Sequence, residues 1–251
     1  MRPVKNFPSL FFERMMNLKR ILVLNGSCRY QGSTQFFLES LFNNLDSKEY
    51  KVQYLFCRDF NKMRLNPNTL YDISYTQRNG DSKIYELEEM ILKSDCFVVA
   101  SPVYMHNISS DLKLILEKLS TWSHTLRLDG KPCLVLSTCN SNGNTTVTGY
   151  LCKVLTSMGG KVIANCNALE YQLRDKKWVT SVRKQIQKRI NDKSLFYHSS
   201  SSAIEEVFII LKKVIELREK SGDESEEVMY WKTNNLINFE TFQEYLTWKG
   251  N

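Results

Sequence analysis

Apolar and polar positions alternate along this chain in a pattern that predicts a parallel β-sheet covered by helices. Short apolar runs typical of buried strands lie near residues 20–25, 51–56, 95–100, 132–138 and 161–168. Between and after these runs, apolar residues recur at helical spacing near residues 33–45, 82–93, 109–122, 145–158 and 176–192. The alternation favours a doubly wound α/β fold with strand order 2-1-3-4-5. In such a sheet a ligand binds beyond the carboxyl ends of strands 1 and 3.

The segment after the first strand has the features of an anion site. It reads Gly-Ser-Cys-Arg-Tyr-Gln-Gly-Ser-Thr over residues 26–34. The next apolar positions place a helix from Ser33 onward: Phe36, Phe37, Leu41 and Phe42. Free backbone N–H groups at a helix N-terminus favour an anion, and further donors come from Ser27, Arg29, Ser33 and Thr34. The spacing matches neither the triphosphatase loop nor the dinucleotide loop. The alternative is a plain strand-to-helix turn.

A second loop follows the third strand and reads Ser-Pro-Val-Tyr-Met-His-Asn over residues 101–107. The pattern predicts that the next helix is capped by Ser109 and carries apolar residues at positions 112, 115, 116 and 119. Together the two loops resemble the NADPH-dependent FMN reductase family, within the flavodoxin-like fold, and its iron–sulfur flavoprotein-like branch is the most similar. The family patterns Gly-Ser-x-Arg-x-x-Gly-x-Thr and Ser-Pro-Val/Ile-Tyr are both present. The resemblance covers residues 18–190.

The resemblance implies an FMN-binding protein. The first loop would hold the phosphate, and the second would pass the edge of the isoalloxazine ring. The loop over residues 137–144 would contact the pyrimidine side, although it is Gly-rich in the family and here keeps only Gly143. The implied cofactor-binding residues are Ser27, Arg29, Ser33, Thr34, Pro102, Val103, Tyr104, Met105, Asn107, Thr138, Cys139, Asn140 and Gly143. His106 is a candidate proton donor, and a packing or surface role is the alternative.

The resemblance also implies a reaction. Hydride would pass from NADPH or NADH through FMN to a second acceptor, and no side chain need act as a nucleophile. The acceptor would be a small or peptide-like molecule, and its possible classes are a quinone, a free flavin, a nitro or azo compound, or an unsaturated natural-product intermediate. Iron–sulfur members carry a Cys cluster in the region of residues 58–81, where this chain has no Cys, so we expect no cluster and no metal. The alternatives are an electron carrier or FMN-binding regulator without turnover, and a non-flavin binding module.

The composition of the chain narrows the class of protein to which it can belong. The chain has 251 residues and is 42% hydrophobic, enough for one core and an appendage, and no apolar stretch reaches the length of a membrane span. The first residues make a poor signal peptide. Seven Cys without a Cys-x-x-Cys pair indicate a reducing cytoplasm. The net charge of +7 suits anionic ligands, but dispersed Lys and Arg predict no nucleic-acid binding.

We expect three segments: an N-terminal arm over residues 1–17, a flavodoxin-like domain over 18–198 and a helical extension over 199–251. In the extension, one helical stripe has apolar residues at positions 204, 207, 208, 211, 214 and 215. An aromatic segment follows, with Tyr230, Trp231, Phe239, Phe242, Tyr245 and Trp248. Either these aromatics pack in a core of their own, or they form an arm that wraps a partner subunit or covers the flavin pocket. We expect burial in an interface, and a homodimer or homotetramer.

Overall fold

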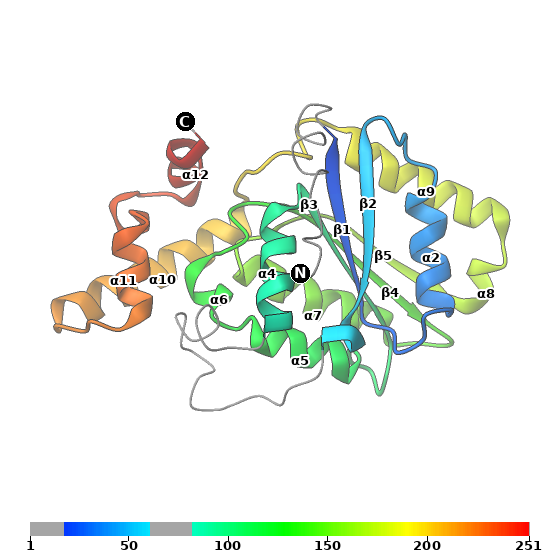
Figure 1. Cartoon of the computed structure of the whole chain (residues 1–251), viewed down its shortest axis with the longest axis horizontal. Helices are drawn as coiled ribbons and strands as arrows, with labels where there is room; N and C mark the ends of the chain where they lie inside the picture. Colours follow the sequence, from blue (N-terminus) through cyan, green and yellow to red (C-terminus); the bar gives the residue numbers. More distant parts are fainter. Residues whose placement is uncertain (1–17, 61–81, 251) are drawn as a thin grey trace, which may run out of the picture.

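A five-stranded parallel sheet forms the centre of the computed structural model, which describes residues 18–60 and 82–250. The strands run in the order β2-β1-β3-β4-β5, as the sequence predicts (Figure 1). Their bounds are β1 (Lys19–Asn25), β2 (Tyr50–Phe56), β3 (Cys96–Pro102), β4 (Pro132–Cys139) and β5 (Lys161–Leu169). The chain therefore has the doubly wound α/β fold, with the switch in strand order between β1 and β3.

Helices cover both faces of the sheet because successive strand residues point to opposite sides. On one face, Ile21 and Val23 of β1 pack with α2 (Ser33–Phe42), α8 (Glu170–Leu173) and α9 (Lys176–Asn191). On the other, Leu22 and Leu24 pack with α4 (Ser82–Lys93), α5 (Ser110–Lys118) and α7 (Asn144–Ser157). Figure 1 shows these two layers on either side of the strands.

Two predicted helices differ from the structure in detail. The first ends at Phe42 rather than near residue 45, and its Phe36 is 52% exposed while Phe37 is fully buried. Adjacent residues on a helix lie about 100° apart, so only one of the pair can face the sheet. The helix predicted over residues 109–122 ends at Lys118, and a separate short helix, α6 (Trp122–Thr125), follows it.

The residues after 198 form a helical extension with its own apolar core. Its elements are α10 (Ser202–Lys220), α11 (Glu226–Thr233), the 3₁₀ turn η3 (Leu236–Asn238) and α12 (Phe242–Gly250). Trp231, Phe242 and Tyr245 are at most 1% exposed and pack on Phe208 of α10 and its neighbours. The expectation that these aromatics are buried in an interface is therefore wrong for these three. No helix in the described part of the chain is long and apolar enough to cross a membrane.

The extension docks at the amino ends of the strands, on the segment that connects α5 to β4. Leu126 of that segment belongs to the core of the extension. The Trp231 indole N–H donates to the His124 carbonyl at 2.8 Å, and Lys249 Nζ lies 2.7 Å from Asp129 Oδ2. His124, Leu126 and Asp129 all lie shortly before Pro132, the first residue of β4. The extension thus lies away from the carboxyl ends of the strands of its own chain and does not cover them (Figure 1).

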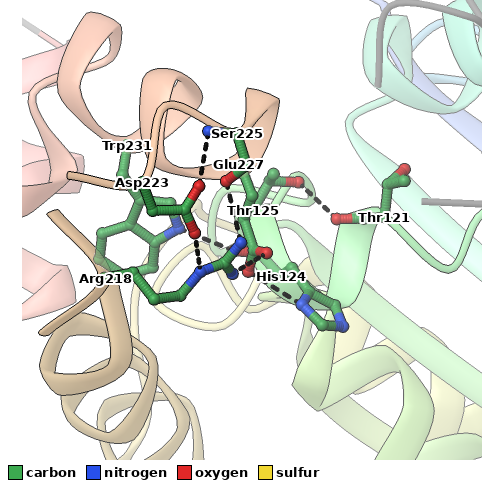
Figure 2. Close-up of polar contacts among 8 residues, drawn as sticks. All are labelled: Thr121, His124, Thr125, Arg218, Asp223, Ser225, Glu227 and Trp231. Atoms are coloured by element: carbon green, nitrogen blue, oxygen red, sulfur yellow. Dashed lines mark hydrogen bonds and ion pairs between the residues drawn. The ribbon is translucent and has the colours of Figure 1, made fainter. Parts of the chain in front are cut away.

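A charged network ties the extension to α6. Glu227 accepts a hydrogen bond from Arg218 Nη1 at 2.6 Å and contacts His124 Nδ1 at 2.9 Å (Figure 2). Arg218 also reaches Asp223 at 2.6 Å and Ser225 at 2.9 Å. The hydrogen bond to Glu227 raises the pKa of His124. Burial raises the pKa of Glu227, but the bonds from His124 and Arg218 outweigh it and leave that pKa below its ordinary value. The network therefore favours a protonated His124.

Candidate functional site

Three loops meet at the carboxyl ends of β1, β3 and β4. We call them the first loop (residues 26–34), the second loop (residues 103–109) and the third loop (residues 140–143). Gly26 packs so closely on the second that an added Cβ would lie 3.0 Å from Ser109 Oγ. Thr34 Oγ1 is 2.7 Å from Thr138 Oγ1, which joins the first loop to the base of the third. Val103 donates its N–H to the Thr138 carbonyl at 3.0 Å. The parallel sheet thus brings together the loops that the sequence singled out.

The first loop presents an array of free backbone donors. In the described part of the chain, the N–H groups of residues 30–35 have no hydrogen-bond partner, and the first helical bond runs from Phe36 N to the Gly32 carbonyl. Gly32 is the N-cap of α2 and supplies no side-chain acceptor, and the first turn of the helix contains no acidic residue. Arg29 is exposed beside this array. Such an N-terminus is electrostatically suited to an anion.

Buried polar side chains hold the start of the first loop in place. Asn25 accepts the Ser27 N–H at 2.8 Å and donates to Gln35 Oε1 at 2.9 Å, so it ties the end of β1 to the first turn of α2. Ser27 Oγ in turn accepts the Arg29 N–H at 3.1 Å. Asn25 and Ser27 are 0% and 4% exposed. Their hydrogen bonds fix the curvature of the loop without using the N–H groups further along it.

A brace from the end of β2 supports the same loop, and no motif in the sequence predicts it. Arg58 Nη1 donates to the Cys28 carbonyl at 2.6 Å, and its guanidinium lies 4.6 Å from the centre of the Tyr30 ring. The Tyr30 hydroxyl donates to Asp59 at 2.6 Å, and this bond raises the pKa of Tyr30. The only signal in the sequence is that Arg58 and Asp59 follow the end of the second strand, which lies next to the first in the sheet.

The second loop is a tight turn with unusual backbone angles. Tyr104 and Asn107 exchange two backbone hydrogen bonds of 2.9 Å, and Met105 and His106 between them have φ values of 49° and 60°. Positive φ at two residues other than Gly costs about 1 kcal/mol or more each. Such strain commonly marks a functional position.

The turn decides which backbone donors of the second loop are open. The N–H groups of Val103 and Tyr104 are used inside the protein, as are those of Asn107 and Ile108. Among the described residues, those of Met105 and His106 have no partner. Met105 is 95% exposed and Tyr104 is 45% exposed, with its hydroxyl 3.8 Å from Cys28 Sγ of the first loop. Donors for a ligand in this loop therefore come from its tip, and not from the residues directly after Pro102.

Gly143 lets the third loop approach the second. It has φ of 90°, and an added Cβ would lie 2.9 Å from Val103 Cγ1 and 3.0 Å from His106 Nδ1. The Asn140 side of this loop is exposed, while Cys139 is half-buried and burial raises the pKa of its thiol. The position next to His106 therefore requires a glycine for both its backbone angle and its lack of a side chain.

Two buried oxygens at this end of the sheet lack partners. Ser137 Oγ and Asn167 Oδ1 make no hydrogen bond to the described part of the chain, and Ser137 and Asn167 are neighbours across β4 and β5. Buried polar atoms of this kind are normally satisfied by water or a ligand. Sequence patterns did not single out Asn167, because its neighbour across the sheet depends on the strand register.

Metal-ligating side chains do not gather anywhere in residues 18–60 or 82–250. No group of three or more His, Cys, Asp or Glu side chains in those ranges could hold a metal ion. The segment that carries the Cys cluster in iron–sulfur members falls largely on residues 61–81, which lie outside the described residues. Absence of a cluster there stays a prediction from the sequence.

Comparisons with known proteins identify the family. The model of the family described as NADPH-dependent FMN reductase matches residues 19–173, which span β1 to α8 and include all three loops. Members of this family typically bind FMN and use NAD(P)H.

Solved structures support the same fold. RosB with the bound intermediate 8-demethyl-8-formylriboflavin-5'-phosphate is similar with TM-score 0.56 and 16% identity, over 82% of this chain and 88% of that chain. An azoreductase from Bacillus anthracis str. Sterne matches with TM-score 0.51 and 14% identity, over 68% of this chain and 98% of its own. A flavone reductase matches with TM-score 0.52 and 13% identity, over 72% and 66% of the two chains. At these identities the likeness establishes the fold.

Proposed function

The chain belongs to the NADPH-dependent FMN reductase family of flavin oxidoreductases, and from that membership we propose that it is an enzyme that binds FMN at the three loops. In this proposal NADPH or NADH reduces the cofactor, which then reduces a second acceptor. When bound, FMN supplies the hydride and electron chemistry. The chain itself holds the cofactor, orients it and controls access to it.

The observation that carries the proposal is the row of free N–H groups over residues 30–35, next to Arg29. A monophosphate offers several acceptor oxygens and close to two negative charges, which match donors that point outward from a helix N-terminus. Ser27 and Thr34 hold the loop more than they bind, because Ser27 Oγ and Thr34 Oγ1 already contact Arg29 N and Thr138 Oγ1. We therefore assign the phosphate to the backbone donors, with Arg29 and Ser33 as the side chains that add to them.

The second and third loops support a binding place for the isoalloxazine ring. We propose that the ring edge receives hydrogen bonds from the open N–H groups of Met105 and His106 and packs beside Tyr104. Gly143 keeps the space next to His106 free of a side chain. Pro102, Val103 and Asn107 set the turn, and Thr138, Cys139 and Asn140 form the opposite wall. His106 remains the candidate proton donor, since its imidazole lies at the tip of the second loop beside Gly143.

The nature of the acceptor is a separate proposal. RosB and the azoreductase share the fold with this chain, but at identities of 16% and 14% neither protein's substrate transfers to it. We retain a quinone, a free flavin, a nitro or azo compound, or an unsaturated natural-product intermediate. We also place the chain nearest to the iron–sulfur flavoprotein-like branch, without its cluster. Analysis of iron and acid-labile sulfide in anaerobically purified protein tests the absence of the cluster. Stoichiometric amounts of iron and sulfide would contradict that absence.

Anaerobic stopped-flow mixing with NADPH tests the enzymatic function. FMN-loaded protein should lose the visible absorbance of its oxidised flavin in a saturable, first-order phase and regain it when an acceptor is added. An electron carrier or FMN-binding regulator would retain the yellow colour after NADPH and lose it only with a partner reductase. A colourless preparation that binds no added FMN would contradict flavin binding altogether.

A further inference from the structure

The segment that follows β2 leaves the sheet beside the first loop. Asn25, the last residue of β1, is paired in the sheet with Phe56, the last residue of β2. Because the two strands are parallel, the chain emerges from both at the same end of the sheet. The 3₁₀ turn η1 (Cys57–Phe60) follows at once, and its two end residues are buried in the core next to α4 and α5. Arg58 and Asp59 are therefore exposed side chains on an anchored turn.

Tyr30 of the first loop is held by three side chains from the end of β2 and from η1. Its hydroxyl donates to Asp59 Oδ1 at 2.6 Å, and the Arg58 guanidinium lies 4.6 Å from the centre of its ring. The Phe56 ring packs at 77° to the Tyr30 ring, with the two ring centres 4.7 Å apart. Tyr30 is 49% exposed, yet its position is fixed by these contacts. Its backbone N–H is the first of those over residues 30–35 that are free in the described part of the chain.

The peptide unit between Cys28 and Arg29 is tied at both of its polar groups. Arg58 Nη1 donates to the Cys28 carbonyl at 2.6 Å, and the Arg29 N–H donates to Ser27 Oγ at 3.1 Å. Since a peptide unit is planar, these two bonds fix its orientation directly before the free N–H groups of residues 30–35. Loss of the bond from Arg58 would leave the carbonyl free to turn toward an anion bound there, and its partial negative charge would weaken that binding.

We propose that Arg58, together with Tyr30 and Asp59, positions the first loop to hold a phosphate and thereby gives the site its preference for FMN over riboflavin. The inference rests on the proposed function, which places the FMN phosphate at this loop. Arg58 is a positioning residue in this arrangement, because it acts through the Cys28 carbonyl and the Tyr30 ring. Donors that are already ordered bind an anion more tightly, since binding then costs less conformational entropy.

The exposure of these contacts separates the role from a purely structural one. The bond from Arg58 to Cys28 and the bond from Tyr30 to Asp59 both lie at the surface. Exposed contacts of this kind contribute little to the free energy of unfolding. The bond to Asp59 raises the pKa of Tyr30, so the phenol keeps its proton through neutral pH. The contacts should therefore act on phosphate affinity and leave the stability of the fold nearly unchanged.

Calorimetric titrations of FMN and of riboflavin into the same protein test the inference. Arg58→Gln should weaken FMN binding about tenfold and leave riboflavin binding unchanged, since riboflavin has no phosphate. Tyr30→Phe removes only the hydroxyl bonded to Asp59 and should weaken FMN binding about threefold. Asp59→Asn keeps an oxygen acceptor for that hydroxyl and should bind FMN at least as tightly as wild type. Arg189→Gln is the matched control, because it removes the same charge from an exposed position in the last turn of α9.

The double variant Arg58→Gln with Tyr30→Phe tests whether the two residues act as a unit. Its FMN affinity should be within about twofold of that of Arg58→Gln alone, whereas independent contacts would multiply their effects. The midpoint of urea unfolding without FMN should stay close to that of wild type in every variant. Should Arg58→Gln not fold, the ratio of FMN to riboflavin affinity in Tyr30→Phe decides in its place.

The two titrations also separate this inference from the proposed function. An Arg58→Gln protein that keeps the wild-type preference for FMN overturns the inference. A protein that loses affinity for both flavins equally also overturns it, because that result marks a general structural role. In both cases the proposed function stands if wild type binds FMN more tightly than riboflavin. A wild type that binds the two flavins equally, or binds neither, contradicts the phosphate site of the proposed function and overturns the inference with it.

Discussion

The sheet has an amino edge, where its parallel strands begin, and a carboxyl edge, where they end. Polar groups are paired at the first and left open at the second. At the amino edge, Glu227 binds both His124 and Arg218, and the Trp231 indole N–H has a carbonyl partner. At the carboxyl edge, the N–H groups of residues 30–35, Met105 and His106 have no partner in the described chain. Donors that lack a protein partner at the surface bond to water, and an anionic ligand can take the place of that water. The comparison assigns stability to the amino edge and binding to the carboxyl edge.

Backbone strain also differs between the carboxyl edge and the amino edge. The carboxyl edge contains the left-handed residues Met105 and His106 and the crowded Gly143. The extension instead encloses a close-packed core in which Phe208 and Trp231 stack with ring centres 5.5 Å apart. Variants at one edge should therefore change the free energy of unfolding, and variants at the other should change FMN affinity. Single substitutions at each edge can show whether stability and FMN affinity separate in this way.

The largest expected effect is on stability, at Trp231. Trp231→Ala removes a fully buried indole and its hydrogen bond to the His124 carbonyl, and should lower the free energy of unfolding by about 3–5 kcal/mol. FMN affinity of the folded protein should change less than about twofold. Urea denaturation and FMN titration measure the two quantities. Trp248→Ala is the control, because Trp248 is 49% exposed and should cost about 1 kcal/mol or less. Equal losses in the two variants would contradict the packing described for the extension.

Gly143→Ala should affect both quantities, since it strains the backbone and crowds Val103 and His106. We expect a loss of about 1–3 kcal/mol in stability and of about tenfold in FMN affinity. Gly149→Ala in α7, the helix that follows Gly143, is the control, because an added Cβ there meets no atom within 4 Å. It should raise stability by about 0.5–1 kcal/mol. A Gly143→Ala protein with normal stability and affinity would show that the close approach of the second and third loops is unimportant.

Tyr104→Ala should act on the ring environment and leave the fold intact. Tyr104 is 45% exposed in the strained second loop, so we expect about 1 kcal/mol or less in FMN or substrate affinity and a shifted flavin potential. Tyr197→Ala, at a 64% exposed position, is the control. His106→Ala should slow turnover only where proton delivery limits it. If His106→Ala abolished flavin reduction by NADPH in stopped flow while Tyr104→Ala had no effect, the roles of these two residues would have to be exchanged.

The smallest expected effect is a pH dependence at the amino edge. The pKa of His124 is raised, chiefly by its hydrogen bond to Glu227, so the folded chain holds this proton more tightly than the unfolded chain. The stabilisation is complete below the unfolded pKa of about 6.5 and is lost as pH rises through the folded pKa. Because the pair is partly exposed, we expect less than about 1 kcal/mol.

The measurement is the difference in free energy of unfolding between wild type and His124→Gln, followed from acid to alkaline pH. Taking the difference removes the contribution of His198, whose pKa is lowered by burial and which acts with the opposite sign. The difference should be larger below about pH 6.5 than in alkaline solution. A difference that grows with rising pH would contradict the assignment.

The sequence predicted the sheet well because buried parallel strands have a clear local signal. Strand bounds, the Ser109 cap and the three loops follow from short patterns around each element, and the structure has Ser109 Oγ accepting the Leu112 N–H at 3.3 Å. The brace by Arg58 and Tyr30 could not be predicted, because it depends on β2 lying beside β1. The turn at Met105 and His106 was also hidden, since positive φ is uncommon at residues other than Gly.

In the extension, too, local sequence patterns could not predict contacts between distant elements. Its aromatic residues predicted burial, but the pattern alone did not say against what, and the aromatics pack on α10 of the same chain. Val214 fits an apolar helical stripe in sequence, yet its side chain lies on the open side of α10. Periodicity locates an apolar face on a helix. It does not decide which of two adjoining apolar faces meets the core.

Calorimetric titration of FMN into the Arg29→Ala, Ser33→Ala double variant tests the central claim most directly. Loss of these charge-assisted bonds should weaken binding by about 2–4 kcal/mol, while the free energy of unfolding without FMN stays close to that of wild type. The matched control is Ser181→Ala with Arg189→Ala, two exposed positions on α9 that should bind FMN as wild type does. Unchanged FMN affinity in the first double variant would contradict the assignment of the phosphate to the first loop.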